Sequence, residues 1–299
     1  MVDSSHTYKF AVIGTPITHS LSPAMHNAAF EACGARAEMF AYDPADANGY
    51  RMWCRQVRTA ESPGGVCGFC TTVPYKLLAL QECAQVSQRA RAIGAVNTIT
   101  RTSHGELMGD NTDAPGFGRA LQSGLDDTLG ISINGASVVI FGTGGVARAI
   151  LYELIARNAE VITVVSRRME NARRLIEEVC PADFQNAGRC RAATGIDDTI
   201  ADILINATPL GLNPADRLIV DAEKIAAHGR YLFDAVYQPS ATTRLVAAAR
   251  AAGVPAQDGR LMLVEQGVIA SSLWNDFYGI WGDRGTRDSV RSAMMSVVR

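Results

Sequence analysis

The sequence predicts an α/β protein with two domains, and two observations support this prediction. The chain has 299 residues, more than the ~100–200 residues of a typical single domain. Short apolar runs rich in β-branched residues alternate with helix-like segments, which is the pattern of βαβ units around a parallel sheet. A hydrophobic fraction of 47% and a charged fraction of 19% fit a folded protein with an apolar core.

The first third of the chain contains the first set of alternating elements. The apolar run over residues 8–14 ends in glycine and predicts a buried strand. After a loop rich in proline and serine, apolar spacing predicts a helix over residues 24–33, opened by Pro23. Further strands are expected at residues 38–42, 66–73, 95–101 and 106–110, the last two forming a hairpin.

A change in composition over residues 123–136 marks the start of a second unit. A β-branched strand is expected at residues 136–141, followed by a helix over 144–157. The alternation continues with a strand at 161–166, a helix at 169–180, strands at 201–208 and 230–237, and a helical stretch from residue 261 to residue 299.

Charge and hydropathy exclude several kinds of partner. The formal net charge is −2, and no block of like charge is present. Nucleic acids and anionic membranes require clustered lysine and arginine, so neither is expected as a partner. No run of 18 apolar residues predicts a membrane span, and the first ten residues do not resemble a signal peptide. We expect a cytoplasmic monomer or homodimer that binds a small molecule.

The seven cysteines are odd in number and scattered, which argues against a disulfide framework. Cys67 and Cys70 form a CxxC pair, but no second pair or suitably spaced histidines complete a zinc site. A redox role would require a thioredoxin-like context, whereas this pair lies in an apolar, strand-like segment. We therefore expect two small buried thiols and no metal.

A glycine-rich turn follows the strand expected at residues 136–141. In the segment from Phe141 to Ala147, Gly142 permits a tight turn, Gly144 permits close approach of a pyrophosphate, and the small Ala147 permits close helix packing. The helix start then offers free N–H groups to the phosphates. The strand–turn–helix context makes this GxGxxA motif a predicted dinucleotide site.

The residues after the next strand indicate which dinucleotide binds. An NAD enzyme places an acidic residue there to accept hydrogen bonds from the ribose 2′-hydroxyl. This chain has Ser166, Arg167 and Arg168 instead, and guanidinium groups suit a 2′-phosphate. A solvated basic turn is the alternative interpretation. Together with the glycine turn, the pattern favours NADP.

Four polar groups precede this turn in the chain, and each also has a purely structural explanation. Ser20 and Ser22 alternate before Pro23, so in an extended segment both could bind one carboxylate, although Ser22 could instead cap a helix. Lys76 ends the segment that begins at Thr72, where a solvated surface lysine is the alternative.

The other two polar groups are an asparagine and an aspartate. Asn97 interrupts an apolar strand and could be a structural hydrogen-bonding bridge. Asp113 ends the segment GDNTD and could cap a helix that begins near Pro115. The joint appearance of all four groups before a nucleotide turn favours a shared site.

The ordered motifs resemble those of the shikimate dehydrogenase family, which includes shikimate and quinate dehydrogenases, and the resemblance runs nearly end to end. The matching segments are AVIGTPITHSLSPAMHNAAF, GFCTTVPYK, GAVNTI, GDNTDAPGF, IFGTGGVARA, NATPLG, DAVYQP and MLVEQG. The resemblance implies a substrate-binding domain of residues 1–112 completed by helices in 258–299, and a Rossmann-type NADP-binding domain of residues 113–257. It also implies a role in aromatic amino acid biosynthesis through chorismate.

The resemblance further implies a role for each matching residue. Lys76 and Asp113 would be the catalytic pair. The substrate would contact Ser20, Ser22, Thr72, Asn97, Tyr237 and Gln266. The cofactor would contact Gly142, Thr143, Gly144, Gly145, Val146, Ser166, Arg167, Arg168, Thr208 and Gly259.

These residue types fit the oxidation of a secondary alcohol, here the interconversion of shikimate and 3-dehydroshikimate with NADP(H). A lysine ammonium stabilises the developing alkoxide, and an aspartate orients the hydroxyl. The chain departs from the family pattern at Cys70, Leu261 and Glu265. Quinate and an aminoshikimate therefore stay open as substrates, as does a homologue that senses the metabolite without catalysis.

Overall fold

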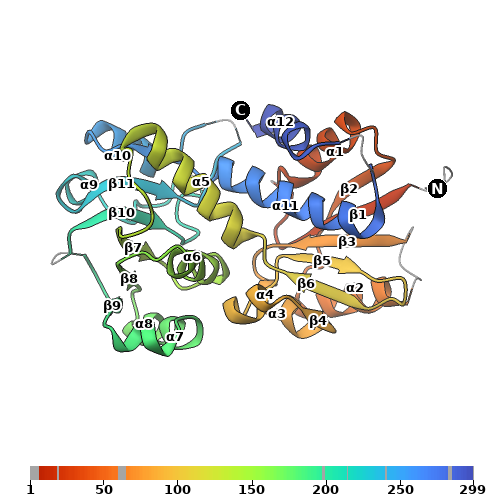
Figure 1. Ribbon diagram of the computed structural model, residues 1–299, viewed down its shortest axis with the longest axis horizontal. Helices are drawn as coiled ribbons and strands as arrows, with labels where there is room; N and C mark the ends of the chain where they lie inside the picture. The colour runs from red at the N-terminus through yellow and green to blue at the C-terminus, as the bar shows by residue number, and fades with distance from the viewer. Residues whose placement is uncertain are drawn as a thin grey trace. The chain divides into compact units, whose positions relative to one another are not determined.

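The computed structural model describes residues 7–18, 20–59, 65–196, 199–213, 215–239, 241–281 and 285–298. The chain divides into two compact units. Unit 1 comprises Met1–Thr112 with Leu263–Arg299, and unit 2 comprises Asp113–Met262. Each unit contains one β-sheet with helices against both of its faces (Figure 1). The α/β class predicted from the sequence is confirmed.

Unit 1 is built on a mixed sheet of order β2-β1-β3-β5-β6-β4. Its strands are β1 (Tyr8–Ile13), β2 (Ala37–Tyr42), β3 (Val66–Thr71), β4 (Gln85–Val86), β5 (Thr98–Arg101) and β6 (Leu107–Asp110). Its helices are α1 (Ser22–Ala32), α2 (Ala47–Arg58), α3 (Lys76–Glu82), α4 (Gln88–Ile93), most of α11 (Arg260–Tyr278) and α12 (Arg287–Val298). The hairpin predicted from the sequence is the antiparallel pair β5–β6.

Two apolar clusters hold the helices of unit 1 against its sheet. One contains Phe10, Met25 and Trp274 and joins α1, α11 and α12 to one face, while α2, α3 and α4 pack on the other. Helix α11 approaches β3 closely because Gly68 has no side chain: a Cβ there would lie 2.7 Å from Nε1 of Trp274. That same indole nitrogen donates a hydrogen bond to the carbonyl of Ile99 (3.1 Å).

Unit 2 has the sheet order β12-β11-β10-β7-β8-β9, and every strand pair described in it is parallel. Its strands are β7 (Ser137–Phe141), β8 (Val161–Val165), β9 (Cys190–Ala193), β10 (Ala201–Asn206), β11 (Gly229–Asp234) and β12 (Ala256–Gln257). Its helices are α5 (Asp113–Thr128), α6 (Gly145–Ala156), α7 (Met169–Val179), α8 (Ala182–Asn186), α9 (Ala222–His228) and α10 (Arg244–Ala251). The strand order reverses between β7 and β10, as in doubly wound nucleotide-binding sheets.

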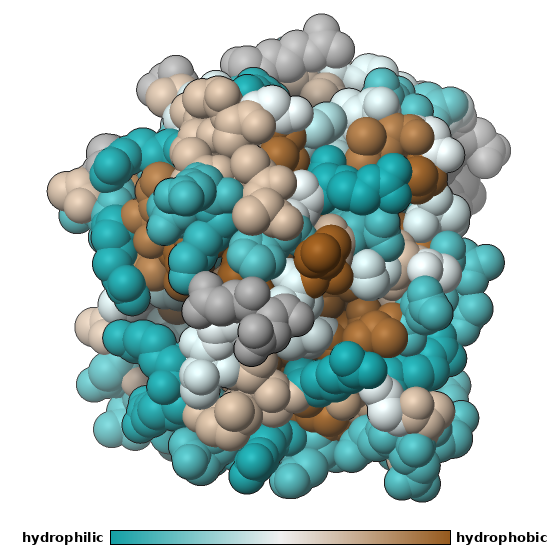
Figure 2. Space-filling view, turned by 90° about the vertical axis from the view of Figure 1, so that its left-hand side faces the viewer, coloured by the Kyte–Doolittle hydropathy of each residue, from teal (hydrophilic) through white to brown (hydrophobic). Residues whose placement is uncertain are grey.

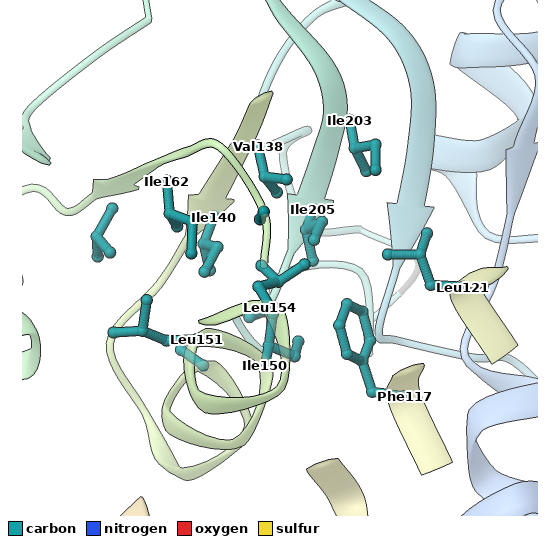
Figure 3. Close-up of a cluster of buried hydrophobic side chains, with 14 of the residues drawn as sticks. Phe117, Leu121, Val138, Ile140, Ile150, Leu151, Leu154, Ile162, Ile203 and Ile205 are labelled. Atoms are coloured by element: carbon teal, nitrogen blue, oxygen red, sulfur yellow. The ribbon is translucent and has the colours of Figure 1, made fainter. Parts of the chain in front are cut away.

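The core of unit 2 forms because buried aliphatic strands meet the apolar faces of α5 and α6. Figure 3 shows these side chains pointing toward one another from α5, β7, α6, β8 and β10. Phe117 also contacts Phe233 edge to face, with ring centroids 5.1 Å apart. On the molecular face shown in Figure 2, apolar patches are interrupted by polar residues.

Three local predictions need correction. The helix expected over residues 24–33 begins at Ser22, and the helix expected near Pro115 begins at Asp113. The helical stretch expected from residue 261 to residue 299 is divided into α11 and α12. Gly279, with φ of +63°, follows α11 in a left-handed conformation, which explains why the first helix ends there.

Candidate active site

The strand order of unit 1 brings four polar segments to one end of its sheet. Strands β1 and β3 are parallel, so the segments that follow Ile13 and Thr71 leave the sheet at the same end. Strand β5 is antiparallel to β3, and β6 to β5, so residue 97 before β5 and residues 111–113 after β6 lie at that end too. The strand order also reverses between β1 and β3, where open α/β sheets bind ligands.

The segments after β1 and β3 pack directly against each other. A Cβ on Gly14 would lie 2.4 Å from Cγ2 of Thr72, so this contact requires glycine. The backbone N–H of Thr15 donates to the carbonyl of Val73 (3.1 Å), and the Thr15 hydroxyl is 2.8 Å from that of Tyr75. Lys76 follows Tyr75 as the first residue of α3, and its side chain is only 8% exposed. The alternative interpretation of Lys76 as a solvated surface lysine is therefore wrong.

Ser20 and Ser22 lie at the start of α1, but not in the extended segment that the sequence analysis assumed. Leu21 has helical backbone angles and is the N-cap residue, so Ser22 is not the cap. The backbone N–H of Ser22 donates to Oγ of Ser20 (3.3 Å). The side chain of Ser20 therefore lies beside the backbone of Ser22 because the helix begins there. It does not do so because alternate residues of a strand share a face.

Asn97 is the centre of a buried hydrogen-bond network in unit 1. Its Nδ2 donates to Oγ1 of Thr112 (3.0 Å) and to Oε1 of Gln266 (3.3 Å). Its Oδ1 accepts from the backbone N–H of Thr112 (2.7 Å) and from the Thr98 hydroxyl (3.0 Å). Gln266 is itself fixed by donation from Nε2 to the carbonyl of Leu263 (2.8 Å). Asn97 is therefore a structural bridge that also orients Gln266.

Asp113 is the first residue of α5 and of unit 2, and it directly follows Thr112 of this network in the chain. It is buried and belongs to the first turn of the helix rather than to a cap near Pro115. A carboxylate in the first turn interacts favourably with the helix dipole.

Unit 2 contains a cavity of about 750 Å³ at the carboxyl ends of β7, β8, β9 and β10. Among the residues predicted to contact the cofactor, those that line this cavity are Gly142, Thr143, Gly144, Ser166, Arg167, Arg168 and Thr208. Gly145 and Val146 begin α6 directly behind this lining, and Gly259 lies before α11. Binding pockets for organic ligands commonly have volumes of about 300–1,000 Å³.

The glycine turn after β7 has the backbone that a dinucleotide requires. Gly142 has φ of +117°, and a Cβ there would lie 2.8 Å from the carbonyl oxygen of Ala207. A Cβ on Gly144 would meet nothing within 4 Å, so the space beside this glycine is open. Gly144 is the N-cap of α6 and makes no side-chain cap, which leaves helix N–H groups available for phosphate oxygens. These residues, with Arg167 and Arg168, fit a phosphorylated dinucleotide.

Thr208 is held at the cavity by a chain of buried polar side chains that the sequence analysis did not identify. Its hydroxyl and backbone N–H both donate to Oδ1 of Asn206 (2.7 and 3.0 Å). Nδ2 of Asn206 donates to Asp234 (2.9 Å), and the Thr243 hydroxyl donates to the other oxygen of Asp234 (2.7 Å). Burial raises the pKa of Asp234 to about 6. Half-buried Tyr237 lies three residues after Asp234.

Gly259 is a close contact point rather than a lining residue. Its N–H donates to the carbonyl of Val236 (3.0 Å), and a Cβ there would lie 2.4 Å from the carbonyl oxygen of Ala235. Further lining residues that the sequence analysis did not identify are Asn171, Thr194, Gly195, Ile196, Arg217, Leu218, Ile219, Val220, Asp221 and Lys224. No motif marks them: Asn171 lies on α7, and the position of the others depends on how the chain returns after β9 and β10.

The departures from the family pattern have structural explanations. Glu265 is buried and forms an ion pair with Arg291 of α12. Cys70 packs in the apolar cluster of α1, α11 and α12, and Leu261 packs against the core of unit 2. Cys67 is buried as expected.

Within the described part of the chain, no group of three or more histidine, cysteine, aspartate or glutamate residues could hold a metal ion. No helix among the described residues is long and apolar enough to span a membrane.

Unit 2 has a parallel sheet with a glycine turn where its strand order reverses, and unit 1 gathers hydroxyl, amide and ammonium groups at one end of its sheet. These features define the class of protein as a dinucleotide-dependent oxidoreductase. A family model described as the shikimate dehydrogenase substrate binding domain matches residues 12–99. The shikimate dehydrogenase (NADP(+)) of Methanosarcina mazei is 40% identical over 89% of this chain and 91% of its own length. That of Methanopyrus kandleri is 35% identical over 99% and 97%.

A solved structure agrees with these sequence relationships. Shikimate 5-dehydrogenase from Thermus thermophilus, solved in complex with NADP(H) and shikimate, is 33% identical to this chain. The comparison covers 97% of this chain and 100% of that chain, with a TM-score of 0.78. This chain belongs to the shikimate dehydrogenase family.

Proposed function

We propose that this protein interconverts 3-dehydroshikimate and shikimate with NADP(H). The observation that carries the proposal is the Asn97 network, which holds Gln266 at the end of the unit 1 sheet from which Ser20, Ser22 and Lys76 also emerge. Hydroxyl and amide groups of this kind suit a ring that carries a carboxylate and several hydroxyls. The names of the relatives support the same substrate and cofactor.

In this proposal the polar groups of unit 1 recognise the substrate, and the contact expected for Tyr237 stays a prediction. Ser20 and Ser22 bind the carboxylate at the start of α1. Asn97, Gln266 and Thr72 bind ring hydroxyls. The buried hydrogen bonds of Asn97 keep these groups in one arrangement, which lowers the entropic cost of binding the ring.

Lys76 and Asp113 form the proposed catalytic pair. In the oxidising direction the Lys76 amine accepts the hydroxyl proton, and the resulting ammonium stabilises the oxygen as it develops negative charge. In the reducing direction the Lys76 ammonium donates that proton to the ketone oxygen. Asp113 accepts a hydrogen bond from the same hydroxyl and orients it. Because Lys76 is buried, its charge acts in a medium of lower dielectric than water, which strengthens the stabilisation.

The proposed NADP site is the cavity of unit 2. Gly142 to Val146 would surround the pyrophosphate at the start of α6, Ser166 to Arg168 would bind the 2′-phosphate, and Thr208 and Gly259 would border the nicotinamide half. When bound, NADP supplies the hydride acceptor or donor. The protein contributes position and charge.

The deciding experiment is a spectrophotometric assay of the purified protein with shikimate, quinate and aminoshikimate, each with NADP and NAD. The proposal expects the highest kcat/KM for shikimate with NADP, and reduction of 3-dehydroshikimate by NADPH. A preference for quinate or aminoshikimate would reassign the substrate. Ligand binding without turnover of any of them would instead identify a sensing homologue. A monomeric or homodimeric state and a cytoplasmic location stay predictions.

A further inference from the structure

The segment that follows β10 crosses back over the ends of β8 and β9. Val220 is buried in the same apolar cluster as Val165, at the end of β8, and Ile196, just after β9. Nδ1 of His228, at the end of α9, lies 2.8 Å from the carbonyl of Thr199 on the connection between β9 and β10. This return places residues 217–224 along the cavity wall that also contains the segment after β8.

The loop leading into this wall is fixed by its own hydrogen bonds. Oδ2 of Asp216 accepts from the backbone N–H of Gly211 (2.9 Å) and of Asn213 (3.3 Å). Nε2 of Gln238 donates to the carbonyl of Gly211 (2.6 Å), and Arg244 donates to the carbonyl of Asp216 (2.8 Å). The backbone leading to Arg217 is therefore ordered before a ligand binds, which limits the entropy lost when Arg217 binds one.

The charge of the cavity exceeds what one pair of arginines supplies. Its charged lining residues are Arg167, Arg168, Arg217, Lys224 and Asp221, an excess of three positive charges. The Asp221 carboxylate already accepts from the backbone N–H of Lys224 (2.9 Å). Among the residues that the structure describes, Arg217 has no ion-pair partner. An excess of positive charge in a cavity attracts a multiply charged anion.

We infer that Arg217 and Lys224 form a second cationic wall that binds the 2′-phosphate of NADP together with Arg167 and Arg168. This inference rests on the proposed function of the cavity. The 2′-phosphate is the group concerned because Val220 and Ile196 place this wall beside the ends of β8 and β9, whereas the pyrophosphate belongs to the glycine turn after β7. A phosphate monoester carries a charge of about −1.5 to −2 and three acceptor oxygens, so it can accept from more than two side chains.

The test measures binding of 2′,5′-ADP and 5′-AMP by calorimetry to the full-length protein and to the variants R217Q and K224Q. These two ligands differ only in the 2′-phosphate. We expect each variant to bind 2′,5′-ADP more weakly, on the order of tenfold for R217Q, with affinity for 5′-AMP changed less than about twofold. R217K should recover part of the loss, because it restores the positive charge.

The matched control is R230Q, because Arg230 pairs with Asp202 at the opposite, amino-terminal end of the same sheet. It removes an arginine from unit 2 without touching the cavity, so it should leave both affinities unchanged. Wild-type protein that binds neither 2′,5′-ADP nor NADPH would refute the proposed cofactor site itself. If wild-type protein binds both ligands, two results would overturn the second wall alone. One is that R217Q and K224Q bind 2′,5′-ADP as tightly as wild type. The other is that the two variants lose as much affinity for 5′-AMP as for 2′,5′-ADP.

Discussion

The side-chain amide of Asn97 donates a hydrogen bond to Oε1 of Gln266 at 3.3 Å, although 169 residues separate the two in the chain. Both are buried, so neither amide can exchange this contact for one with bulk water. The bond joins the start of β5 to α11, the helix that returns to unit 1 at the end of the chain. Two of the proposed substrate-binding residues are thus positioned by each other.

Removing either amide should therefore weaken both folding and substrate binding. We expect Asn97→Ala to lower the free energy of unfolding by about 1–3 kcal/mol, because Thr112 and Gln266 lose a buried partner. The main effect of Gln266→Ala should be a higher KM for the substrate, with only a small loss in the free energy of unfolding. Denaturant unfolding and steady-state kinetics measure the two effects. In a double-mutant cycle, additive losses would contradict coupling between the two residues.

Lys76→Ala tests the catalytic assignment. We expect kcat to fall by about 10²–10⁴-fold, since the developing alkoxide loses its cationic partner and its proton donor. Substrate affinity, measured by fluorescence or calorimetry, should change much less. Lys9→Ala is the matched control, because Lys9 lies in the same unit and is partly exposed beside Glu38. Full turnover in Lys76→Ala would reject the assigned role.

Arg167 and Arg168 should distinguish NADPH from NADH. Exchanging both for glutamine should raise KM for NADPH on the order of tenfold, because charge-assisted hydrogen bonds to the 2′-phosphate are lost. KM for NADH should stay nearly constant. Arg191→Gln, an exposed arginine on β9, provides the control. Equal changes for the two cofactors would show that these side chains do not read the 2′-phosphate.

The two glycines of the turn should respond differently to alanine. Gly142→Ala forces a side chain onto a backbone with φ of +117° and into the Ala207 carbonyl, so we expect a loss of about 1–3 kcal/mol of stability. Gly144→Ala meets no protein atom within 4 Å and should leave the melting temperature nearly unchanged while weakening NADPH binding. Thermal melts and cofactor titrations separate the two cases; identical behaviour would argue against the different roles assigned to them.

Acid sensitivity of unit 1 should depend on His26. Burial lowers the pKa of this histidine to about 3, and its Nδ1 lies 2.9 Å from the Ser271 hydroxyl. Near pH 6.5 the His26 imidazole binds a proton only in the unfolded chain. The stability associated with neutral His26 is therefore complete above that pH. It is lost progressively as the pH falls toward 3. Between pH 7.5 and 5.5 the free energy of unfolding should fall by about 1.4 kcal/mol through this residue.

The variant His26→Gln should lack that part of the pH dependence, and the exposed His104→Gln should keep it. The difference between each variant and wild type is the relevant quantity. Asp234 contributes with the opposite sign, because burial raises its pKa to about 6 and the folded state binds its proton first as the pH falls. Equal pH dependence of wild type and His26→Gln would show that His26 is not the group responsible.

Much of the fold could be predicted because its strongest signals are local. Apolar runs and glycine punctuation located β1, β7 and β8, and the alternation indicated the parallel sheet of unit 2. Helix α2 was not predicted, although Tyr50, Trp53, Cys54 and Val57 have helical spacing and Asp46 caps the helix by accepting from Gly49 (2.8 Å). The signal was present there, and a count of helical spacing would have detected it.

Other features could not be predicted because no local signal encodes them. The position of Ser22 inside α1 depends on the helical conformation of Leu21 rather than on the serine pattern itself. Glu265 departs from the family pattern in the sequence, but its carboxylate pairs with Arg291 on another helix. Whether a side chain enters a site or leaves it depends on which elements pack beside it.

The sequence by itself determined the class of fold, the glycine turn, the basic residues after β8 and the membership of a family, because these depend on residue type at short spacing. Only the tertiary structure decided that Asn97 meets Gln266, that Asn206 and Asp234 support Thr208, and that Arg217 lies along the same cavity as Arg167. The reason is physical. Hydrogen bonds and charges act over a few ångströms, and strand order decides which distant residues come within that range.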